Sequence, residues 1–250
     1  RSWLPDLGVR WSFGVDGIAV PLVLLTAAIG VLVAAHAWVD LPAGGSPAAF
    51  LGCLLLVEAG ALATFTARDA VLFFVAFELV LVPMWVLISR YGDPHDAGAR
   101  TEAGYRFVLY TAVGSTLMLV GILTLVTSAG TSDLWALADG AGRALTPDRQ
   151  LLVAALLVAG LAVKVPVFPV HTWLPSAHTT APTAGSVLLA AVLLKMGTYG
   201  LVRLPVDTVP DGFARLAPVL AVLGVVGIIW GGLICLVERD LKRLIAYSSV

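Results

Sequence analysis

The sequence predicts an all-α, polytopic transmembrane helix bundle in which one helix is discontinuous, and composition is the first observation behind this prediction. Hydrophobic residues make up 59% of the 250 residues and charged residues only 12%, against roughly 25% charged residues in soluble domains. The net charge of −1 excludes a basic surface for holding nucleic acid. Cys53 and Cys235 lie in separate apolar runs, which argues against a disulfide framework and a cysteine-based metal site.

The second observation is a series of apolar runs of membrane-spanning length. A bilayer core about 30 Å thick requires roughly 20 apolar residues per helix. The ten-residue alternation of barrel strands is absent, so helices are expected. We predict one transmembrane domain over residues 1–250, with spans at 17–37, 47–66, 70–89, 103–128, 150–180 (broken), 185–203 and 213–237, and the start of another at 240. Since the chain begins without methionine and stops inside a helical pattern, we expect a fragment that lacks helices at both ends.

The third observation is that four ionisable residues fall inside these spans: Glu58, Glu78, Lys164 and Lys195. Such residues are costly in lipid and are functional candidates by default. The chain holds three lysines and twelve arginines, yet two of the lysines lie at bilayer depth. A desolvated lysine can lose its proton near neutral pH and an arginine cannot, so reversible protonation is favoured over static pairs that orient the helices.

Two of these positions carry further expectations. Glu58 either takes part in proton transfer or hydrogen-bonds a hydroxyl, such as that of Thr64 or one on another helix. Pro83 follows Glu78 by five residues and frees the carbonyl of Leu79, so it predicts a bend in the helix beside the carboxylate.

The discontinuous helix is predicted from the segment KVPVFPVHTWLP that begins at Lys164. Its three prolines cannot share one unbroken helix, and the apolar run before Lys164 is too short to span alone. Irregular backbone at this depth is tolerated only inside protein or beside a wet cavity, and such breaks mark ion or substrate sites in transporters. His171 and His178 follow and favour proton relay. A metal site is the alternative, but no Cys, Asp or Glu lies nearby to complete it.

The longest of these patterns resembles a known family. The segment AVKVPVFPVHTWLPSAHTTAPTAGSVLLAAVLLKMGTYGLVR at 162–203 closely resembles the M-type antiporter-like subunits of respiratory NADH–quinone oxidoreductase (complex I), which include mitochondrial subunit 4. Further similar segments are FELVLVPMWVLISRYG at 77–92, RFVLYTAVGSTLML at 106–119 and DLKRLIAYSSV at 240–250. The segments 78–84 and 178–186 are M-like rather than L-, N- or Mrp-like.

The resemblance implies a proton-pumping module of about fourteen helices in two inverted halves, of which this chain would hold the first. It implies that Glu78 pairs with Lys164, that Lys195 continues a chain of buried polar groups, and that His171 and His178 relay protons toward one aqueous face. Two positions depart from the family pattern, Ser176 in place of the usual aspartate and Arg106 in place of a common lysine. Both are expected at helix ends, away from the mechanism.

The resemblance also implies the context of the subunit. It would translocate protons without redox chemistry of its own, since the sequence contains no flavin, nucleotide or iron–sulfur motif. NADH, FMN, iron–sulfur clusters and quinone would bind to partner subunits, and L-type and N-type subunits would be neighbours. The expected location is the bacterial plasma membrane in preference to the mitochondrial inner membrane. An Mrp-type cation/proton antiporter or membrane-bound hydrogenase subunit, a small-molecule transporter and an inert helical scaffold remain alternatives.

Overall fold

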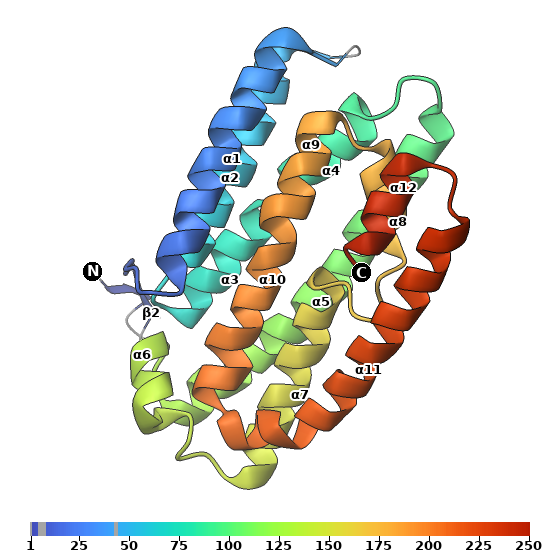
Figure 1. Ribbon diagram of the computed structural model, residues 1–250. Coiled ribbons are helices and arrows are strands. Elements are labelled where there is room, and N and C mark those ends of the chain that lie inside the picture. Colours follow the sequence, from blue (N-terminus) through green and yellow to red (C-terminus); the bar gives the residue numbers. More distant parts are fainter. Residues whose placement is uncertain (1, 5–8, 43–44) are drawn as a thin grey trace.

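Long apolar helices lie side by side through most of the chain in the computed structural model, which describes residues 2–4, 9–42 and 45–250 (Figure 1). Six helical stretches in this part are long and apolar enough to cross a membrane, at 19–39, 47–66, 70–91, 97–129, 183–206 and 210–237. The predicted architecture, a bundle of membrane-spanning helices, is therefore confirmed.

The helices follow one another with short connections. The N-terminal half contains α1 (Ala19–Val39), α2 (Pro47–Thr66), α3 (Ala70–Leu79), α4 (Leu81–Tyr91), α5 (Ala97–Ala129), α6 (Leu134–Ala136) and the π-helical η2 (Leu137–Ala141). The C-terminal half contains α7 (Pro147–Lys164), α8 (Trp173–Thr180), α9 (Thr183–Leu188), η3 (Leu189–Leu193), α10 (Leu194–Leu201), η4 (Val202–Val206), α11 (Pro210–Val237) and α12 (Leu241–Ser248).

A small hairpin of β1 (Ser2–Leu4) and β2 (Val9–Arg10) precedes α1, which the sequence did not predict. The buried carboxylate of Asp69 ties it to the bundle. Its Oδ1 accepts hydrogen bonds from the backbone at the start of α3, and its Oδ2 accepts from the backbone N–H of Arg10 at 2.9 Å and from the Ser132 hydroxyl at 2.5 Å. One carboxylate thus caps a helix and joins three segments of the chain.

Two predicted boundaries were wrong. Helix α5 begins at Ala97 rather than at residue 103, because the Asp96 carboxylate accepts a hydrogen bond from the Ala99 N–H at 2.8 Å and caps the helix earlier. Glu102 pairs with Arg106 one turn later, and these charges do not end the helix. The polar link predicted at 129–149 is also partly helical, since it holds α6, η2 and the first turn of α7, which opens on Pro147.

The bend predicted beside Glu78 is confirmed. Helix α3 ends at Leu79 and α4 begins at Leu81, with Val80 between them. Pro83 has no N–H to donate to the carbonyl of Leu79, so the hydrogen-bond ladder is interrupted one turn before the proline. Glu78 therefore occupies the last turn of α3, where the backbone is already distorted.

The closest helix contact that positions the polar residues joins α5 to α7. A Cβ atom on Gly160 would lie 2.5 Å from the carbonyl oxygen of Gly114, and one on Gly114 would lie 2.8 Å from the carbonyl oxygen of Gly160. Only residues without a side chain allow the two backbones to approach this closely. Ser115 adjoins one glycine, and Lys164 follows the other by one helical turn.

We predict that Gly160→Ala destabilises the protein by ~2 kcal/mol, because the added methyl group meets backbone atoms that cannot move aside, and this cost exceeds the gain in helix propensity. The measurement is the thermal unfolding midpoint of the detergent-solubilised protein. Gly52→Ala in α2 is the matched control, since a Cβ there meets nothing within 4 Å. An unfolding midpoint for Gly160→Ala equal to that of the control would contradict the prediction.

Candidate functional site

The predicted break in the helix is confirmed between Lys164, the last residue of α7, and Trp173, the first residue of α8. The break is held to its surroundings by side chains on both sides. The indole Nε1 of Trp173 donates to the carbonyl oxygen of Val163 at 2.9 Å, which satisfies a backbone group that the break would leave free. The hydroxyls of Thr172 and Tyr110 are 2.7 Å apart, which attaches the break to α5.

Lys164 ends α7 inside the bundle, with 4% of the residue exposed. Its Nζ lies 4.7 Å from the centroid of the Phe77 ring, and Phe77 is itself 3% exposed. A cation over the face of an aromatic ring is attracted by the ring quadrupole, and more strongly when water is excluded. The buried ammonium group therefore rests against an aromatic ring next in sequence to Glu78.

Glu78 is half-buried, and the Ser115 hydroxyl on α5 donates a hydrogen bond to its Oε1. No ion pair joins Glu78 to Lys164 in the described part of the chain, which differs from the direct pairing that the resemblance implied. The physical reason is that each group has another partner, a hydroxyl for the carboxylate and a ring for the ammonium. The two charges still interact through space.

Both predicted histidines are buried near the break. His171 lies within it, stacked on Phe168 with ring centroids 5.6 Å apart, and its Nδ1 has no hydrogen-bond partner among the described residues. His178 lies in α8, and its Nε2 also has no hydrogen-bond partner among the described residues. A buried ring nitrogen without a protein partner is a position where water is expected.

Two polar cavities open beside this part of the chain. One of about 460 Å³ is lined by Thr172, next to His171, and by residues of α5, α8 and α12. The other, of about 420 Å³, is lined by Lys242 and by the residues from Ala181 to Ala184 that follow α8. Each has polar lining groups and room for water. An ammonium, a carboxylate and two imidazoles are groups that can exchange protons, and the first cavity is lined by Thr172 and Thr179, the neighbours in sequence of His171 and His178.

Glu58 lies on α2 with its carboxylate against Gly30 of α1, where a Cβ would lie 2.2 Å from its Oε1. The expected alternative, a hydrogen bond with Thr64, was wrong, because the Thr64 hydroxyl donates to the carbonyl oxygen of Gly60 at 2.8 Å. A threonine inside a helix reaches the carbonyl one turn back more easily than a side chain six residues away. Glu58 instead borders an apolar cavity of about 150 Å³.

Lys195 lies in the predicted span, and its side chain is exposed in the described structure. It follows η3, where the helix widens to a π-turn, and its Nζ donates to the carbonyl oxygen of Ala190 at 2.7 Å. It lies on a face of α10 that no described helix covers. Sequence alone shows that a residue lies at bilayer depth but does not show which side of its helix is packed.

Two further residues belong to the site although the sequence did not single them out. Phe77 contacts Lys164, and Ser115 binds Glu78. Phenylalanine and serine are common in apolar helices, so neither stood out as Glu78 did. The only hint that the sequence offered was their position, because Phe77 directly precedes Glu78 and Ser115 directly follows Gly114. Among the described residues, His, Cys, Asp and Glu form no group of three that could hold a metal ion.

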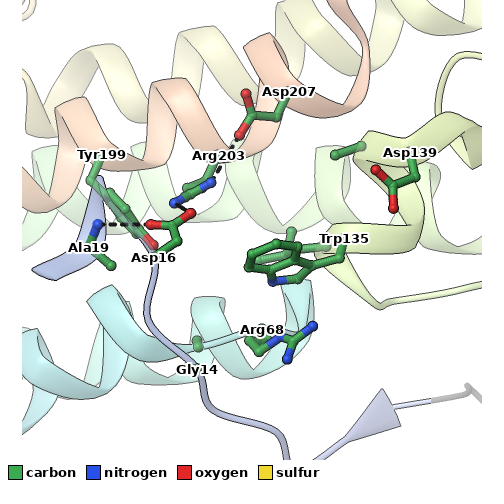
Figure 2. Close-up of a pocket in the computed structure, with 12 residues that line it drawn as sticks. Gly14, Asp16, Ala19, Arg68, Trp135, Asp139, Tyr199, Arg203 and Asp207 are labelled. Atoms are coloured by element: carbon green, nitrogen blue, oxygen red, sulfur yellow. Dashed lines mark hydrogen bonds and ion pairs between the residues drawn. The ribbon is translucent and has the colours of Figure 1, made fainter.

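A second polar cluster lies where η4, the segment before α1 and α6 meet, as Figure 2 shows. The Arg203 guanidinium donates to the Asp16 carboxylate and, at 3.3 Å, to that of Asp207, and it lies 5.2 Å from the centroid of the Tyr199 ring. Arg68 lies 4.6 Å from the centroid of the Trp135 ring. These residues border a cavity of about 230 Å³.

The surroundings of Asp16 lower the pKa of its carboxyl group. Burial by itself raises the pKa of this carboxyl, but hydrogen bonds from the Ala19 N–H and from Arg203, together with the charge of Arg203, outweigh burial. The pKa of Asp16 is therefore held below its ordinary value.

The fold and this set of buried charges define a class, the antiporter-like membrane subunits. Residues 67–250 match the family described as NADH:quinone oxidoreductase/Mrp antiporter, TM. This chain belongs to that family.

Comparisons with individual proteins are consistent with this family. The NAD(P)H-quinone oxidoreductase chain 4 1 of Synechococcus elongatus is 43% identical over 249 residues, which cover 100% of this chain and 45% of the relative. The chain thus spans about half the length of the curated relatives it matches. Respiratory complex I from Thermus thermophilus with bound NADH contains a chain with a TM-score of 0.84 and 32% identity, covering 98% of this chain and 50% of that one. The Mrp complex from Dietzia sp. gives a TM-score of 0.85 and 29% identity, covering 99% and 27%.

We predict that Asp16→Asn lowers the thermal unfolding midpoint at pH 7, because Arg203 loses an ionic partner. Since the folded-state pKa of Asp16 lies below the unfolded value of about 4, its stabilising contribution is present above that value and is lost as the pH falls through the folded-state pKa. The difference in midpoint between wild type and variant should therefore shrink below about pH 4. Asp139→Asn is the control, since Asp139 borders the same cavity without an ion pair in the described structure.

Proposed function

We propose that this chain is part of a proton-translocating membrane subunit of an NADH:quinone oxidoreductase complex. The observation that carries the proposal is the position of the two charges, Glu78 at the bend of one helix and buried Lys164 at the break of another. Proteins use irregular backbone and ionisable side chains at this depth for ion pathways. The family and the M-type resemblance support the choice of complex.

The proposed mechanism depends on the electrostatics of these two groups. When Glu78 approaches Lys164, its negative charge favours the charged form of the lysine, and when it withdraws, that attraction is lost and the ammonium can release its proton. Redox reactions in other subunits would drive the change in separation. His171 and His178 would connect Lys164 to the polar cavities beside the break, since an imidazole both accepts and donates protons near neutral pH.

The surroundings of the subunit are part of the same proposal. The chain itself would carry out no redox step, and NADH, FMN, iron–sulfur clusters and quinone would bind to partner subunits, with L-type and N-type antiporter-like subunits as its membrane neighbours. The bacterial relatives support a location in the bacterial plasma membrane.

We predict that Glu78→Gln and Lys164→Ala each reduce NADH-driven proton pumping to less than about a tenth of wild type, a loss of more than 1.4 kcal/mol in the coupled step. The measurement is acidification of inverted membrane vesicles that carry the full-length subunit in its complex, with assembly checked by native electrophoresis. Asp148→Asn is the control, because Asp148 is an exposed carboxylate in the first turn of α7 and is not part of the lining of the two polar cavities. Normal pumping in both variants would refute the mechanism.

We predict a smaller effect for Lys195→Ala, which should lower the pumping rate less than Lys164→Ala in the same vesicles. Lys195 bonds to a backbone carbonyl of its own helix rather than facing an acidic partner in the described chain. A loss as complete as that of Lys164→Ala would show that Lys195 is an obligatory carrier and not a later member of the pathway.

A second candidate is an Mrp-type cation/proton antiporter, which the family and the match to the Dietzia complex support. The two candidates differ in what drives transport. Na⁺-dependent proton movement that continues in vesicles without NADH would favour the antiporter, whereas proton movement that requires NADH would favour the oxidoreductase. The same test distinguishes a subunit of a membrane-bound hydrogenase, which would not respond to NADH.

A further inference from the structure

The ammonium group of Lys164 is attracted to two neighbouring groups of different chemistry. The first is the carboxylate of Glu78, which interacts with it through space. The second is the face of the Phe77 ring, whose centroid is 4.7 Å from Nζ. The structure holds the ammonium at the ring, while the carboxylate is hydrogen-bonded to Ser115.

These two groups define separate positions for the ammonium. Phe77 and Glu78 are consecutive residues of α3, and consecutive residues of a helix point in directions about 100° apart. The four-carbon side chain of Lys164 is long and flexible enough to move between neighbouring positions without movement of the backbone. Both groups lie within one turn of the bend at Val80, so a change in the bend changes how they face Lys164.

The two positions differ in what they can do with a proton. A carboxylate carries a full negative charge and strongly favours the charged form of the lysine. A phenyl ring attracts the ammonium only through its quadrupole. The ring position therefore keeps the side chain in place away from the carboxylate but favours the charged form less, so the proton can leave toward the histidines beside the break.

The Phe77 ring is itself held in place by a column of aromatic rings. Phe77 is stacked on Phe73 with ring centroids 5.8 Å apart, and Phe73 is stacked on Tyr199 at 6.4 Å. The Tyr199 hydroxyl donates to the carbonyl oxygen of Phe65 at 2.9 Å, and the far end of the column meets Arg203. Figure 2 shows Tyr199 beside Arg203 in the cluster with Asp16 and Asp207. A ring fixed in this way keeps its face toward Lys164.

We propose that Phe77 is a positioning residue that provides the Lys164 ammonium with a second binding position, apart from Glu78, from which the lysine can release its proton. This inference rests on the proposed function, because it assigns a role in the same proton step. In the ring position Lys164 and Glu78 are separated and each has its own partner. In the carboxylate position they pair, and the charged form of the lysine is favoured.

The test replaces Phe77 with phenylalanines carrying one, two and three fluorine atoms in the full-length subunit within its complex. Each fluorine withdraws electron density from the ring face and changes the size of the side chain little. We expect the NADH-driven pumping rate to fall stepwise with each fluorine, by several-fold over the series. Packing alone does not produce such a graded dependence, so the slope reports on the cation–ring contact.

The same series at Phe74 is the control. Phe74 lies in the same helix and is half-buried, but its ring is outside the column and contacts no cation in the described structure. Pumping should be unchanged across the Phe74 series. A conventional pair supplements the test, since Phe77→Trp keeps a π-face and should retain pumping, whereas Phe77→Leu removes it and should not.

The possible outcomes separate this inference from the proposed function. A flat Phe77 series together with an inactive Glu78→Gln variant would overturn the ring position and leave the proposed function intact. Equal slopes at positions 77 and 74 would also overturn it, since they would indicate an effect of fluorination that does not depend on the contact with the cation. Normal pumping in Glu78→Gln would overturn the proposed function and the ring position with it.

Discussion

The contact between Gly114 and Gly160 is the constraint on which the geometry of the site depends. The two backbones approach so closely that neither position accepts a Cβ atom without displacing a carbonyl group. This approach places Ser115 on one helix and Lys164 on the other at the same level of the bundle, with the last turn of α3 beside them. A wider spacing between α5 and α7 would separate Ser115, Glu78 and Lys164, although none of the three would have changed.

Around this contact, two interruptions of the backbone hold the charged residues. The bend at Val80 follows Glu78, and the break that begins after Lys164 is bridged by the bond from Trp173 to Val163. Each interruption leaves backbone groups that side chains or water must satisfy, which is why such places accept polar chemistry inside an apolar bundle. The irregular backbone therefore bends or breaks these helices, and it also allows charged residues to lie in the interior of the bundle.

Much of the fold followed from residue patterns, and part of the site did as well. The prolines after Lys164 were enough to predict the break, and Pro83 was enough to predict the bend, because the loss of a backbone donor is a local property. The start of α5 was misplaced because the cap at Asp96 outweighed the charges that follow it. The exposure of Lys195 and the partners of Glu58 did not follow from the sequence, because both depend on which helices pack together.

By itself, the sequence determined that this protein is a helical membrane bundle with few charges, that Glu78 and Lys164 lie at its irregular points, and that His171 and His178 follow Lys164 closely in the chain. Composition, span length and proline position are local quantities, so they can be evaluated without coordinates. Only the tertiary structure decided that Lys164 faces the Phe77 ring while Glu78 is bound by Ser115. Residues far apart in the chain make these contacts, and the distance between their helices is determined by packing at two glycines whose role appears only when both backbones are in place.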